Sequence, residues 1–273
     1  MPRGRGDSAQ LANRDRRSGN GLESFLEPSI VALLHYSVQY LSIALVSAIS
    51  ATTLSEEPRR GAVLLVDVAG SSAIDDFRRG RDERIGRLSK LHRGQDWIAA
   101  DYTVTAWDEF QSVAWQLQHL PRILLDIRQI FAPWEVYVAV GCGLVSGWQS
   151  DRPINEALGG EGFERARAAM DALKSSPGAK YRRLSQFVTG DGGRDSLLNL
   201  IYGLHDTLVQ QVTERQWETI GAALVLGNQE EVAARLGVQP STVTRNLKRA
   251  HYWQMRETAT LVSAMLAKEQ LAL

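Results

Sequence analysis

The stretch TERQWETIGAALVLGNQEEVAARLGVQPSTVTRNLKRA, Thr213 to Ala250, carries the clearest structural pattern in this chain. Thr213 is placed to cap a first helix, because its hydroxyl can accept a bond from a free N–H group of the first turn. Apolar residues follow at helical spacing. Gly227 and Asn228 end this helix, and Gln229 to Leu236 forms a second, shorter one. The stretch therefore predicts a compact group of short helices.

A tight turn and a third helix complete the pattern. Gly237 stands where the turn needs a positive φ, which a Cβ would penalise. Pro240 suits the first turn of a helix, since its missing N–H would have no partner there. The sequence predicts a helix-turn-helix whose third helix, Pro240 to Ala250, buries Val243 and Leu247.

The outward face of this third helix is polar and basic. In the major groove of DNA, Ser, Thr and Arg side chains read base edges and basic groups hold phosphates. The expected DNA-binding residues are Gln239, Ser241, Thr242, Thr244, Arg245, Lys248 and Arg249. The alternative is a three-helix unit used only for protein contacts or dimerisation.

The same segment resembles the C-terminal DNA-reading helices of sigma-factor region 4 and of response regulators. The T-x-R-Q opening at Thr213 and the L-G-V-x-x-S-T-V core at Leu236 carry this resemblance. It implies that the segment contacts DNA.

The amino-acid composition sets only broad limits on the fold and the function. The chain has 273 residues, 44% hydrophobic and 23% charged, which fits one large or two small cores. Its formal net charge is +0, so any affinity for DNA must come from a local basic surface. The single cysteine, Cys142, excludes an internal disulfide and a multi-cysteine metal site. We therefore expect a cytoplasmic protein.

The N-terminal residues differ from the rest. Residues 1–27 are rich in Arg, Gly and polar residues at their start, and we expect a disordered basic arm. Its arginines are Arg3, Arg5, Arg14, Arg16 and Arg17. Such an arm can remain a solvated tail, or it can contact a DNA backbone or an acidic membrane surface.

Residues 28–55 contain no charged side chain. This length can cross a bilayer as a helix, with the basic arm on the cytoplasmic side. His35, Gln39 and Ser42, however, fall on one narrow polar face. A hydrophobic helix with a narrow polar stripe favours burial in a core or a dimer interface. Membrane insertion and a cleaved signal stay open as alternatives.

Residues 61–192 alternate strand and helix. Strands are expected over 61–67, 102–106, 110–115, 134–144 and 184–189, and helices over 74–91, 117–131 and 162–174. The order β-α-β-β-α-β-α-β favours an α+β fold with a ferredoxin-like palm. We expect residues 193–273 to form a second, all-α domain around the helix-turn-helix.

In this predicted fold, two carboxylates are expected close together. Asp67 ends the first strand and Asp108 lies in the hairpin, so both come to one side of the sheet. Two acids so placed repel unless a divalent cation joins them, and bound Mg²⁺ can then hold a nucleotide. Alternatively, both are ordinary strand-end and turn residues.

Other groups near these aspartates are expected to bind phosphate oxygens. Backbone N–H groups of Gly70, Ser71 and Ser72 can meet phosphate oxygens. Arg165 and Arg167 can approach the same phosphates from the side. Together with the two aspartates, these residues predict a possible nucleotide site.

Four motifs occur in the order found in class III nucleotide cyclases and diguanylate-cyclase palms. They are LLVDVAGSS (64–72), WDEFQ (107–111), VAVGCGLVSG (138–147) and GEGFERARAAM (160–170). The chain resembles most closely the SatD family, which joins a degenerate cyclase-like domain to a C-terminal helix-turn-helix. The resemblance covers residues 61–266, and it implies that Asp67 and Asp108 are the metal-binding aspartates.

The departures from that pattern disfavour catalysis. Trp107 stands where the family pattern has Gly, and Phe163 stands where active cyclases carry Asn, although Arg167 matches their Arg. We therefore expect a dimeric DNA-binding regulator whose palm is a scaffold or nucleotide sensor. The alternatives are a Mg²⁺-dependent nucleotidyl cyclase and a membrane-attached or oligomeric structural protein.

Overall fold

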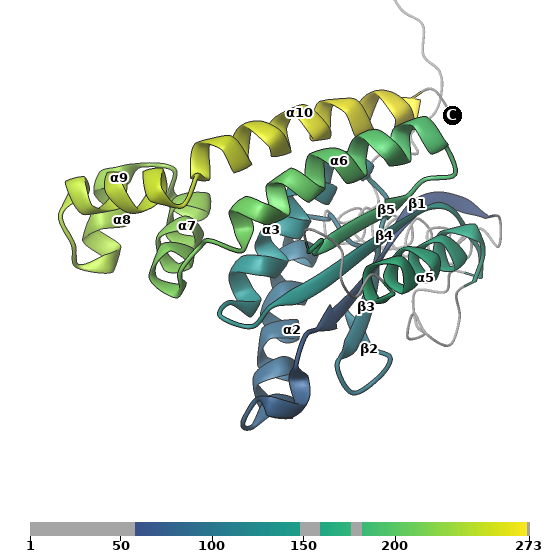
Figure 1. The fold of residues 1–273 in the computed structure, drawn as a ribbon, viewed down its shortest axis with the longest axis horizontal. Coiled ribbons are helices and arrows are strands. Elements are labelled where there is room, and N and C mark those ends of the chain that lie inside the picture. Colours follow the sequence, from purple (N-terminus) through teal and green to yellow (C-terminus); the bar gives the residue numbers. More distant parts are fainter. Residues whose placement is uncertain (1–57, 148–158, 176–181, 272–273) are drawn as a thin grey trace, which may run out of the picture. The chain divides into compact units, whose positions relative to one another are not determined.

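A computed structural model describes residues 58–147, 159–175 and 182–271 (Figure 1). The chain divides into the units Met1–Thr53 and Leu54–Leu273, and all described residues belong to the second. The predicted basic arm (1–27) and charge-free helix (28–55) lie outside the described residues. Within the described ranges, no helix is both long and apolar enough to cross a membrane.

The described strands form one mixed sheet. They are β1 Arg59–Val68, β2 Thr103–Val104, β3 Glu109–Ala114, β4 Val136–Val145 and β5 Ser185–Val188. Their order is β2-β3-β1-β4-β5. All neighbours pair antiparallel except β4 and β5, which are parallel. The mixed α+β class expected from the sequence is confirmed.

Helices cover both faces of this sheet (Figure 1). One face packs against α2 Phe77–Gly94, α3 Leu120–Phe131, α6 Gly192–Val209 and α10 Tyr252–Leu271. The other face packs against α5 Glu161–Lys174. This explains the unbroken apolar run of β1: Leu64 and Val66 enter the first core, and Val63 and Leu65 the second.

The approach of α5 to the sheet depends on glycine. A Cβ at Gly141, on β4, would lie 2.2 Å from the backbone oxygen of Gly162 on α5. No side chain fits that gap, so Gly141 lets α5 lie directly on the sheet. The C-terminal half of α5 is thereby held beside the end of β1.

Three short helices form a separate hydrophobic cluster (Figure 1). They are α7 Glu214–Leu226, α8 Gln229–Leu236 and α9 Pro240–Arg249, and we call them the α7–α9 unit. Their cluster also contains Leu125 of α3 and Leu184, just before β5. The unit therefore packs against α3, on the face of the sheet that α3 covers.

Several element limits differ from the sequence-based expectation. β2 has only two residues, because it pairs with β3 only at Thr103 and Val104. α2 begins at Phe77 rather than Ile74, because a 3-10 turn, η1 Ser71–Ala73, and a left-handed Asp76 precede it. Another 3-10 turn, η2 Leu117–His119, precedes α3. α6 and α10, expected beside the helix-turn-helix, bury Tyr202 and Val262 in the core of the sheet.

Candidate nucleic-acid interface and acidic cluster

The start of α7 is fixed by a reciprocal cap. Thr213 Oγ1 accepts a bond from the Gln216 backbone N–H (3.4 Å), and Gln216 Oε1 accepts one from the Thr213 N–H (2.9 Å). Such a capping box satisfies two helix-end donors at once. Trp217 and Ile220 then turn inward into the core of the α7–α9 unit.

The connection between α8 and α9 is set by glycine and proline. Gly237 has φ +64°, the left-handed conformation that a side chain disfavours. Pro240 occupies the first turn of α9, and Val243 and Leu247 are fully buried against α7 and α8. α9 is therefore held by one apolar edge, and most of its other side chains are exposed to solvent.

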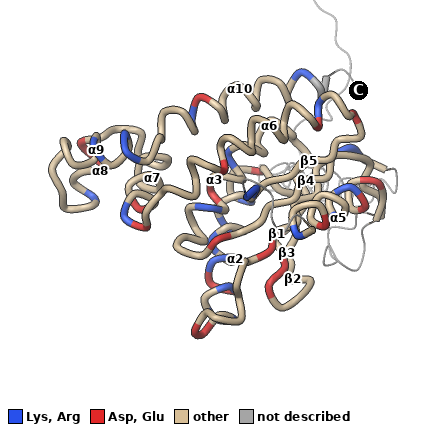
Figure 2. Tube along the Cα trace, viewed as in Figure 1, with Lys and Arg blue, Asp and Glu red and all other residues tan. Residues whose placement is uncertain are grey.

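Most residues predicted to contact DNA lie on this free surface. Gln239, Ser241, Thr244, Arg245, Lys248 and Arg249 are exposed, and Thr242 is half-buried. Figure 2 shows the basic residues of the α7–α9 unit in blue. Within the described ranges, Arg245, Lys248 and Arg249 form no ion pair, and α9 contains no acidic residue. Their charges are therefore available to a polyanion.

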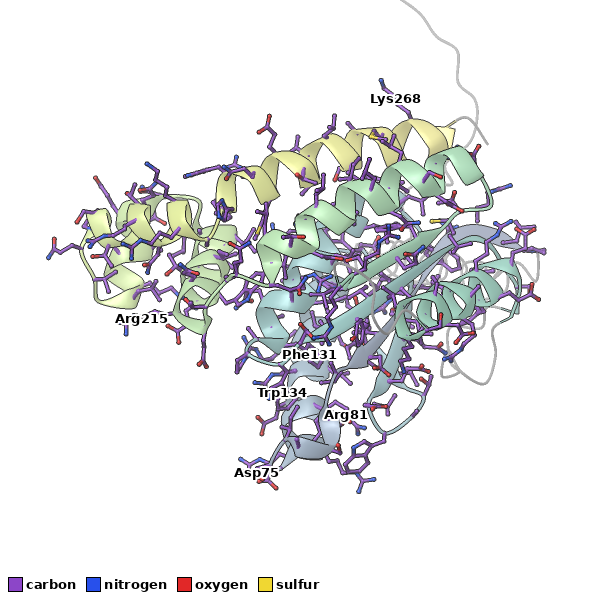
Figure 3. The ribbon with its side chains drawn as sticks, viewed as in Figure 1. Asp75, Arg81, Phe131, Trp134, Arg215 and Lys268 are labelled. Carbon is purple, nitrogen blue, oxygen red and sulfur yellow. The ribbon has the colours of Figure 1, made fainter. Side chains whose placement is uncertain are left out.

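Two polar side chains on α9 have internal partners instead. Thr244 Oγ1 donates to Gln229 Oε1 on α8 at 2.6 Å. Asn246 Nδ2 donates to Thr219 Oγ1 on α7 at 3.2 Å. The structure thus gives Thr244, expected to contact DNA, a role in orienting α9. Arg215, exposed on α7 and labelled in Figure 3, adds a further positive charge to the unit.

An acidic cluster lies at one end of β1 and β3 (Figure 2). Asp67 and Glu109 are paired across these strands, and both are buried. Two cations from α5 meet them. Lys174 Nζ lies 2.5 Å from Asp67 Oδ2, and Arg167 makes a two-bond contact with Glu109 (2.8 and 2.9 Å).

The two acids respond differently to burial. Burial raises the pKa of Asp67, with smaller contributions from the nearby charges of Asp108 and Glu109, and Lys174 only partly offsets this. Burial also raises the pKa of Glu109, but hydrogen bonds from Arg167 and Thr105 outweigh it and hold the pKa below its usual value. Glu109 is therefore the better-stabilised carboxylate of the pair.

The hairpin aspartate is tied to the first loop. Ser71 Oγ donates to Asp108 Oδ2 at 2.9 Å, and the Val68 N–H donates to the Asp108 backbone oxygen at 3.0 Å. Gly70 has φ +65°, which allows the chain to turn after β1. The structure thus brings together Asp67, Asp108, Gly70 and Ser71, as the sequence predicted.

Arg165 does not join this cluster. Its Nη1 donates to the Cys142 backbone oxygen at 2.7 Å, and it pairs with Glu161 at 3.1 Å. Cys142 lies opposite Ala62 on β1, five residues from Asp67. At about 3.3 Å per residue this is roughly 17 Å away. Only Arg167 of the two predicted arginines reaches the cluster.

The cluster does not fit a divalent metal well. Lys174 already neutralises Asp67 directly, and Asp108 accepts from the Ser71 hydroxyl. Among the described residues, no group of three or more His, Cys, Asp and Glu side chains is arranged to hold a metal ion. The ammonium group of Lys174 supplies the positive charge beside Asp67 that a metal cation would otherwise supply.

A hollow of about 740 Å³ opens beside this cluster. Ser71, Ser72, Phe77, Arg78 and Trp107 contribute to its walls. The Trp107 ring is 55% exposed and lies 5.6 Å from the Phe77 ring. Its backbone oxygen accepts a bond from buried Arg81 of α2. Trp107 therefore forms one wall of the hollow, with its ring partly open to solvent.

Three important charged residues, Lys174, Glu109 and Asp206, were not predicted from the sequence. Lys174 and Glu109 are ordinary members of charged segments until the fold brings them together. Asp206, fully buried on α6, accepts bonds from the N–H groups of Leu184 (2.8 Å) and Ser185 (2.7 Å) and pairs with buried Arg128 at 3.0 Å. An acid within the apolar stretch LIYGLHDTLV was the available signal for Asp206.

Comparison with known proteins gives no family. A scan against protein-family models finds no match, and a search of curated proteins finds no similar sequence. Function must therefore be argued from the geometry above.

Proposed function

We propose that this chain is a DNA-binding regulatory protein whose α8 and α9 form a helix-turn-helix. One observation carries the proposal: α9 buries Val243 and Leu247, while its exposed cations form no ion pair with any described residue. These cations are Arg245, Lys248 and Arg249. A helix held in this way can enter the major groove with its N-terminal residues at base edges. In this role Gln239, Ser241 and Arg245 contact bases, and Lys248 and Arg249 contact phosphates.

The sheet serves this function as a scaffold or sensor. The order β2-β3-β1-β4, with antiparallel pairing throughout, is that of a ferredoxin-like palm with β5 added at one edge. This supports kinship with the cyclase-like palm of the SatD family. The ion pairs of Lys174 and Arg167 argue for a site that has lost its metal, and thus against nucleotidyl cyclase activity.

The proposal includes a dimer acting in the cytoplasm. Paired recognition helices contact half-sites about one turn of DNA apart, which one copy of α9 cannot do. α6 presents Leu197, Leu200 and Leu204 to solvent, 44%, 58% and 66% exposed. Their spacing places them on one side of the helix, and we assign this face to contact with a second copy of the chain.

The salt dependence of DNA binding tests the proposal. Binding of the full-length protein to random-sequence duplex DNA is measured from 50 to 300 mM salt for the wild type and for Arg245/Lys248/Arg249→Ala. Each lost phosphate contact lowers the slope of log K against log salt by about 0.9. This variant loses the phosphate contacts of Lys248 and Arg249, so we expect a slope shallower by about 2.

The matched control is Arg87/Lys90/Lys268→Ala, which removes the same charge from exposed positions of α2 and α10. It should retain the wild-type slope. Equal slopes for all three proteins would remove α9 as the DNA-contacting element.

A second function, nucleotide binding at the hollow beside the acidic cluster, is favoured by the exposed Trp107 ring. A base can stack on this ring while Arg78 and Ser72 meet phosphate oxygens. Calorimetry with ATP and GTP tests it. Binding that is independent of Mg²⁺ and lost in Trp107→Ala supports a sensor, whereas no heat in wild-type protein contradicts it.

A further inference from the structure

A hollow of about 380 Å³ lies at the end of the sheet where β1 begins and β4 ends (Figure 1). The acidic cluster, with Asp67, lies at the other end of β1. Thr189 and Arg194, where β5 leads into α6, complete the walls together with two residues that follow β3. We call this cavity the Arg60 hollow. A cavity of about 150 Å³ already admits benzene, so the hollow has room for a ring and a charged group.

The walls of the Arg60 hollow carry positive charge. Arg59, Arg60 and Arg194 all contribute to them, and none of the described residues that line the hollow is acidic. Arg59 and Arg60 form no ion pair with any described residue. A cleft lined by charges of one sign concentrates ions of the opposite sign. The hollow therefore favours an anion.

The three arginines reach the hollow from both faces of the sheet. Successive residues of a strand point to opposite faces, so Arg60 lies on the face of Ala62, which α6 covers. Arg194, in the first turn of α6, lies on that same face. Arg59 lies on the other face, where its guanidinium carbon is 4.7 Å from the centre of the Trp115 ring. This cation–π contact restricts the movement of Arg59.

The acids at the start of α6 have partners within the segment. Asp191 Oδ1 accepts from the backbone N–H of Arg194 at 2.8 Å. Asp195 Oδ1 accepts from both the N–H and the hydroxyl of Thr189, at 2.7 and 2.6 Å. Asp191 is exposed, so water and salt screen its effect on the charge of the hollow.

Apolar side chains form another part of the wall. They belong to Leu117, Cys142 and Leu144, of which the first two are buried and Leu144 is 37% exposed. An inorganic ion would leave this surface in contact with water. A molecule with an apolar body would cover it, which is favourable in proportion to the apolar area removed from water.

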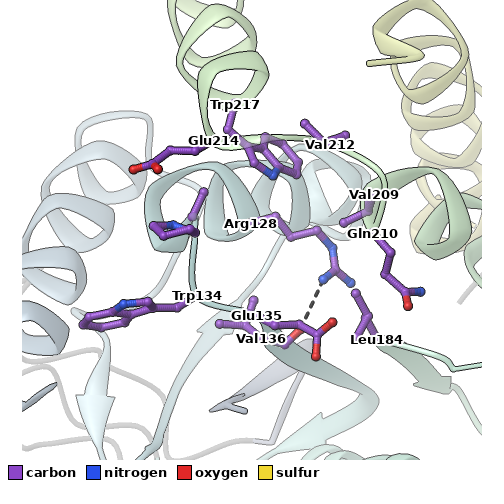
Figure 4. Close-up of a pocket in the computed structure, with 12 residues that line it drawn as sticks. Arg128, Trp134, Glu135, Val136, Leu184, Val209, Gln210, Val212, Glu214 and Trp217 are labelled. Carbon is purple, nitrogen blue, oxygen red and sulfur yellow. Dashed lines mark hydrogen bonds between the residues drawn. The ribbon is translucent and has the colours of Figure 1, made fainter. Parts of the chain in front are cut away.

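The hollow between α7 and the sheet shows the contrast (Figure 4). It has a volume of about 140 Å³, and Glu135 and Glu214 line it together with Arg128. Arg128 is paired with Asp206 at 3.0 Å. Positive charge there is already balanced, so that smaller hollow does not favour an anion as the Arg60 hollow does.

We propose that the Arg60 hollow binds a small phosphorylated organic molecule, with its phosphate at the arginines and its apolar body against the apolar part of the wall. A phosphate monoester carries a charge of about −1.5 to −2 at pH 7, which suits several arginines better than the single charge of a carboxylate. The planar fork of N–H donors on Arg matches phosphate oxygens. The site lies outside α9 and does not rest on the proposed DNA-binding function.

Calorimetric titration of the full-length protein at pH 7 tests the proposal. Phenyl phosphate is the probe, benzoate replaces the phosphate by a carboxylate, and inorganic phosphate lacks the ring. Phenyl phosphate should bind with a 1:1 stoichiometry and at least tenfold more tightly than the other two. Absence of phenyl phosphate binding overturns the proposal. Equal affinity for benzoate overturns the phosphate group, and equal affinity for inorganic phosphate overturns the apolar body.

A first pair of variants locates the bound phosphate. Arg60→Gln together with Arg194→Gln removes two positive charges from the walls, so the affinity for phenyl phosphate should fall at least tenfold. The matched control, Arg87→Gln with Lys90→Gln, removes the same charge from exposed positions of α2 and should bind as the wild type does. Unaltered binding in the Arg60/Arg194 variant overturns the assignment of the site.

A second pair of variants keeps the arginines in place. Leu144→Glu adds a negative charge to the wall, directly opposite Arg60 in the β1–β4 pair, and should lower the affinity at least tenfold. Leu261→Glu makes the same change at an exposed position of α10 outside the hollow, and it should have no effect. Wild-type affinity in Leu144→Glu also overturns the assignment.

Binding of phenyl phosphate to the α9 variant separates this site from the DNA-binding surface. Arg245/Lys248/Arg249→Ala should bind phenyl phosphate as the wild type does, even if its affinity for DNA is lost. Loss of phenyl phosphate binding in this variant would place the phosphate on α9 and overturn the Arg60 hollow. Trp107→Ala should also retain binding, because Trp107 lines the hollow beside the acidic cluster instead.

Discussion

Thr244 Oγ1 donates a hydrogen bond to Gln229 Oε1 at 2.6 Å, and this contact joins α9 to α8. The same hydroxyl lies 3.1 Å from the backbone oxygen of Pro240. Both acceptors belong to the protein, so the hydroxyl proton of Thr244 is used inside the α7–α9 unit. The exposed charges of α9, at Arg245, Lys248 and Arg249, all follow Thr244 in the sequence.

Thr244→Val is therefore expected to weaken DNA binding through the orientation of α9. A side-chain hydrogen bond contributes about 1 kcal/mol, which corresponds to roughly fivefold in affinity. The salt slope should not change, because no phosphate contact is lost. Fluorescence anisotropy with a fixed duplex measures both quantities.

Gln229→Ala provides the matched control, since it removes the same bond from the other side. The double variant should lose no more affinity than either single variant. Additive losses would instead mean that Thr244 contacts DNA directly.

Lys174→Met should destabilise the protein at pH 7 by about 1 to 2 kcal/mol. It leaves Asp67 buried without its cation, but the Lys174 side chain is 46% exposed, so the loss is smaller than for a fully buried pair. The pKa of Asp67, already raised by burial, should rise further. Urea unfolding measures the free energy.

The sign of the pH dependence follows from that pKa. A carboxyl group with a raised folded-state pKa favours the folded state at low pH, and this contribution is lost as pH rises. The difference between Lys174→Met and wild type should therefore shrink as the pH approaches 4. Lys90→Met, at an exposed site on α2, should show little change at either pH. A pH-independent difference would contradict the role given to Asp67.

We expect the free energy of unfolding to fall in mild acid because of His205. Burial, with a smaller contribution from Arg128, lowers the pKa of His205 from 6.5 to about 4. The contribution of His205 to the free energy of unfolding is complete above pH 6.5. It is lost as the pH falls towards 4, because only the unfolded chain takes up the proton in that range. The shift corresponds to roughly 3 kcal/mol.

His205→Phe removes this titration. Urea unfolding at pH 7 and pH 4.5 should show a smaller loss of stability in the variant than in the wild type. Equal losses in both proteins would show that His205 is not the group responsible.

Local sequence patterns predicted much of this fold. The Thr213 cap, the glycine at 237 and Pro240 each act over a few residues, so α8 has the expected bounds and α7 and α9 differ by a residue at one end. The burial of β1 on both faces was also predicted, from its unbroken apolar run. The two-residue length of β2 depends on where it pairs with β3, and the residue pattern of β2 alone did not predict it.

The acidic cluster was only partly foreseeable for the same reason. Asp67 and Asp108 stand at the ends of recognisable strands, so their meeting could be inferred. Lys174 is 107 residues from Asp67 in sequence and meets it only because α5 lies directly on the sheet. Arg165 and Arg167 are two residues apart on a helix, so they point in different directions and only one reaches the cluster.

We expect the protein to form a dimer through the exposed apolar face of α6. Leu200→Glu together with Leu204→Glu places two charges on the exposed apolar face, and the dimer should dissociate. Light scattering of the full-length protein measures the mass. Val225→Glu, which alters an exposed apolar residue on α7, should remain dimeric. A wild-type monomer, or a dimer that survives both changes, would contradict this interface.

Recovery of genomic DNA fragments by the purified full-length protein at physiological salt tests DNA binding most directly. The wild type and the Arg87/Lys90/Lys268→Ala control should enrich fragments that share a sequence motif. Arg245/Lys248/Arg249→Ala should lose that enrichment. No shared motif in the wild type, or the same motif in the α9 variant, would contradict the proposed function.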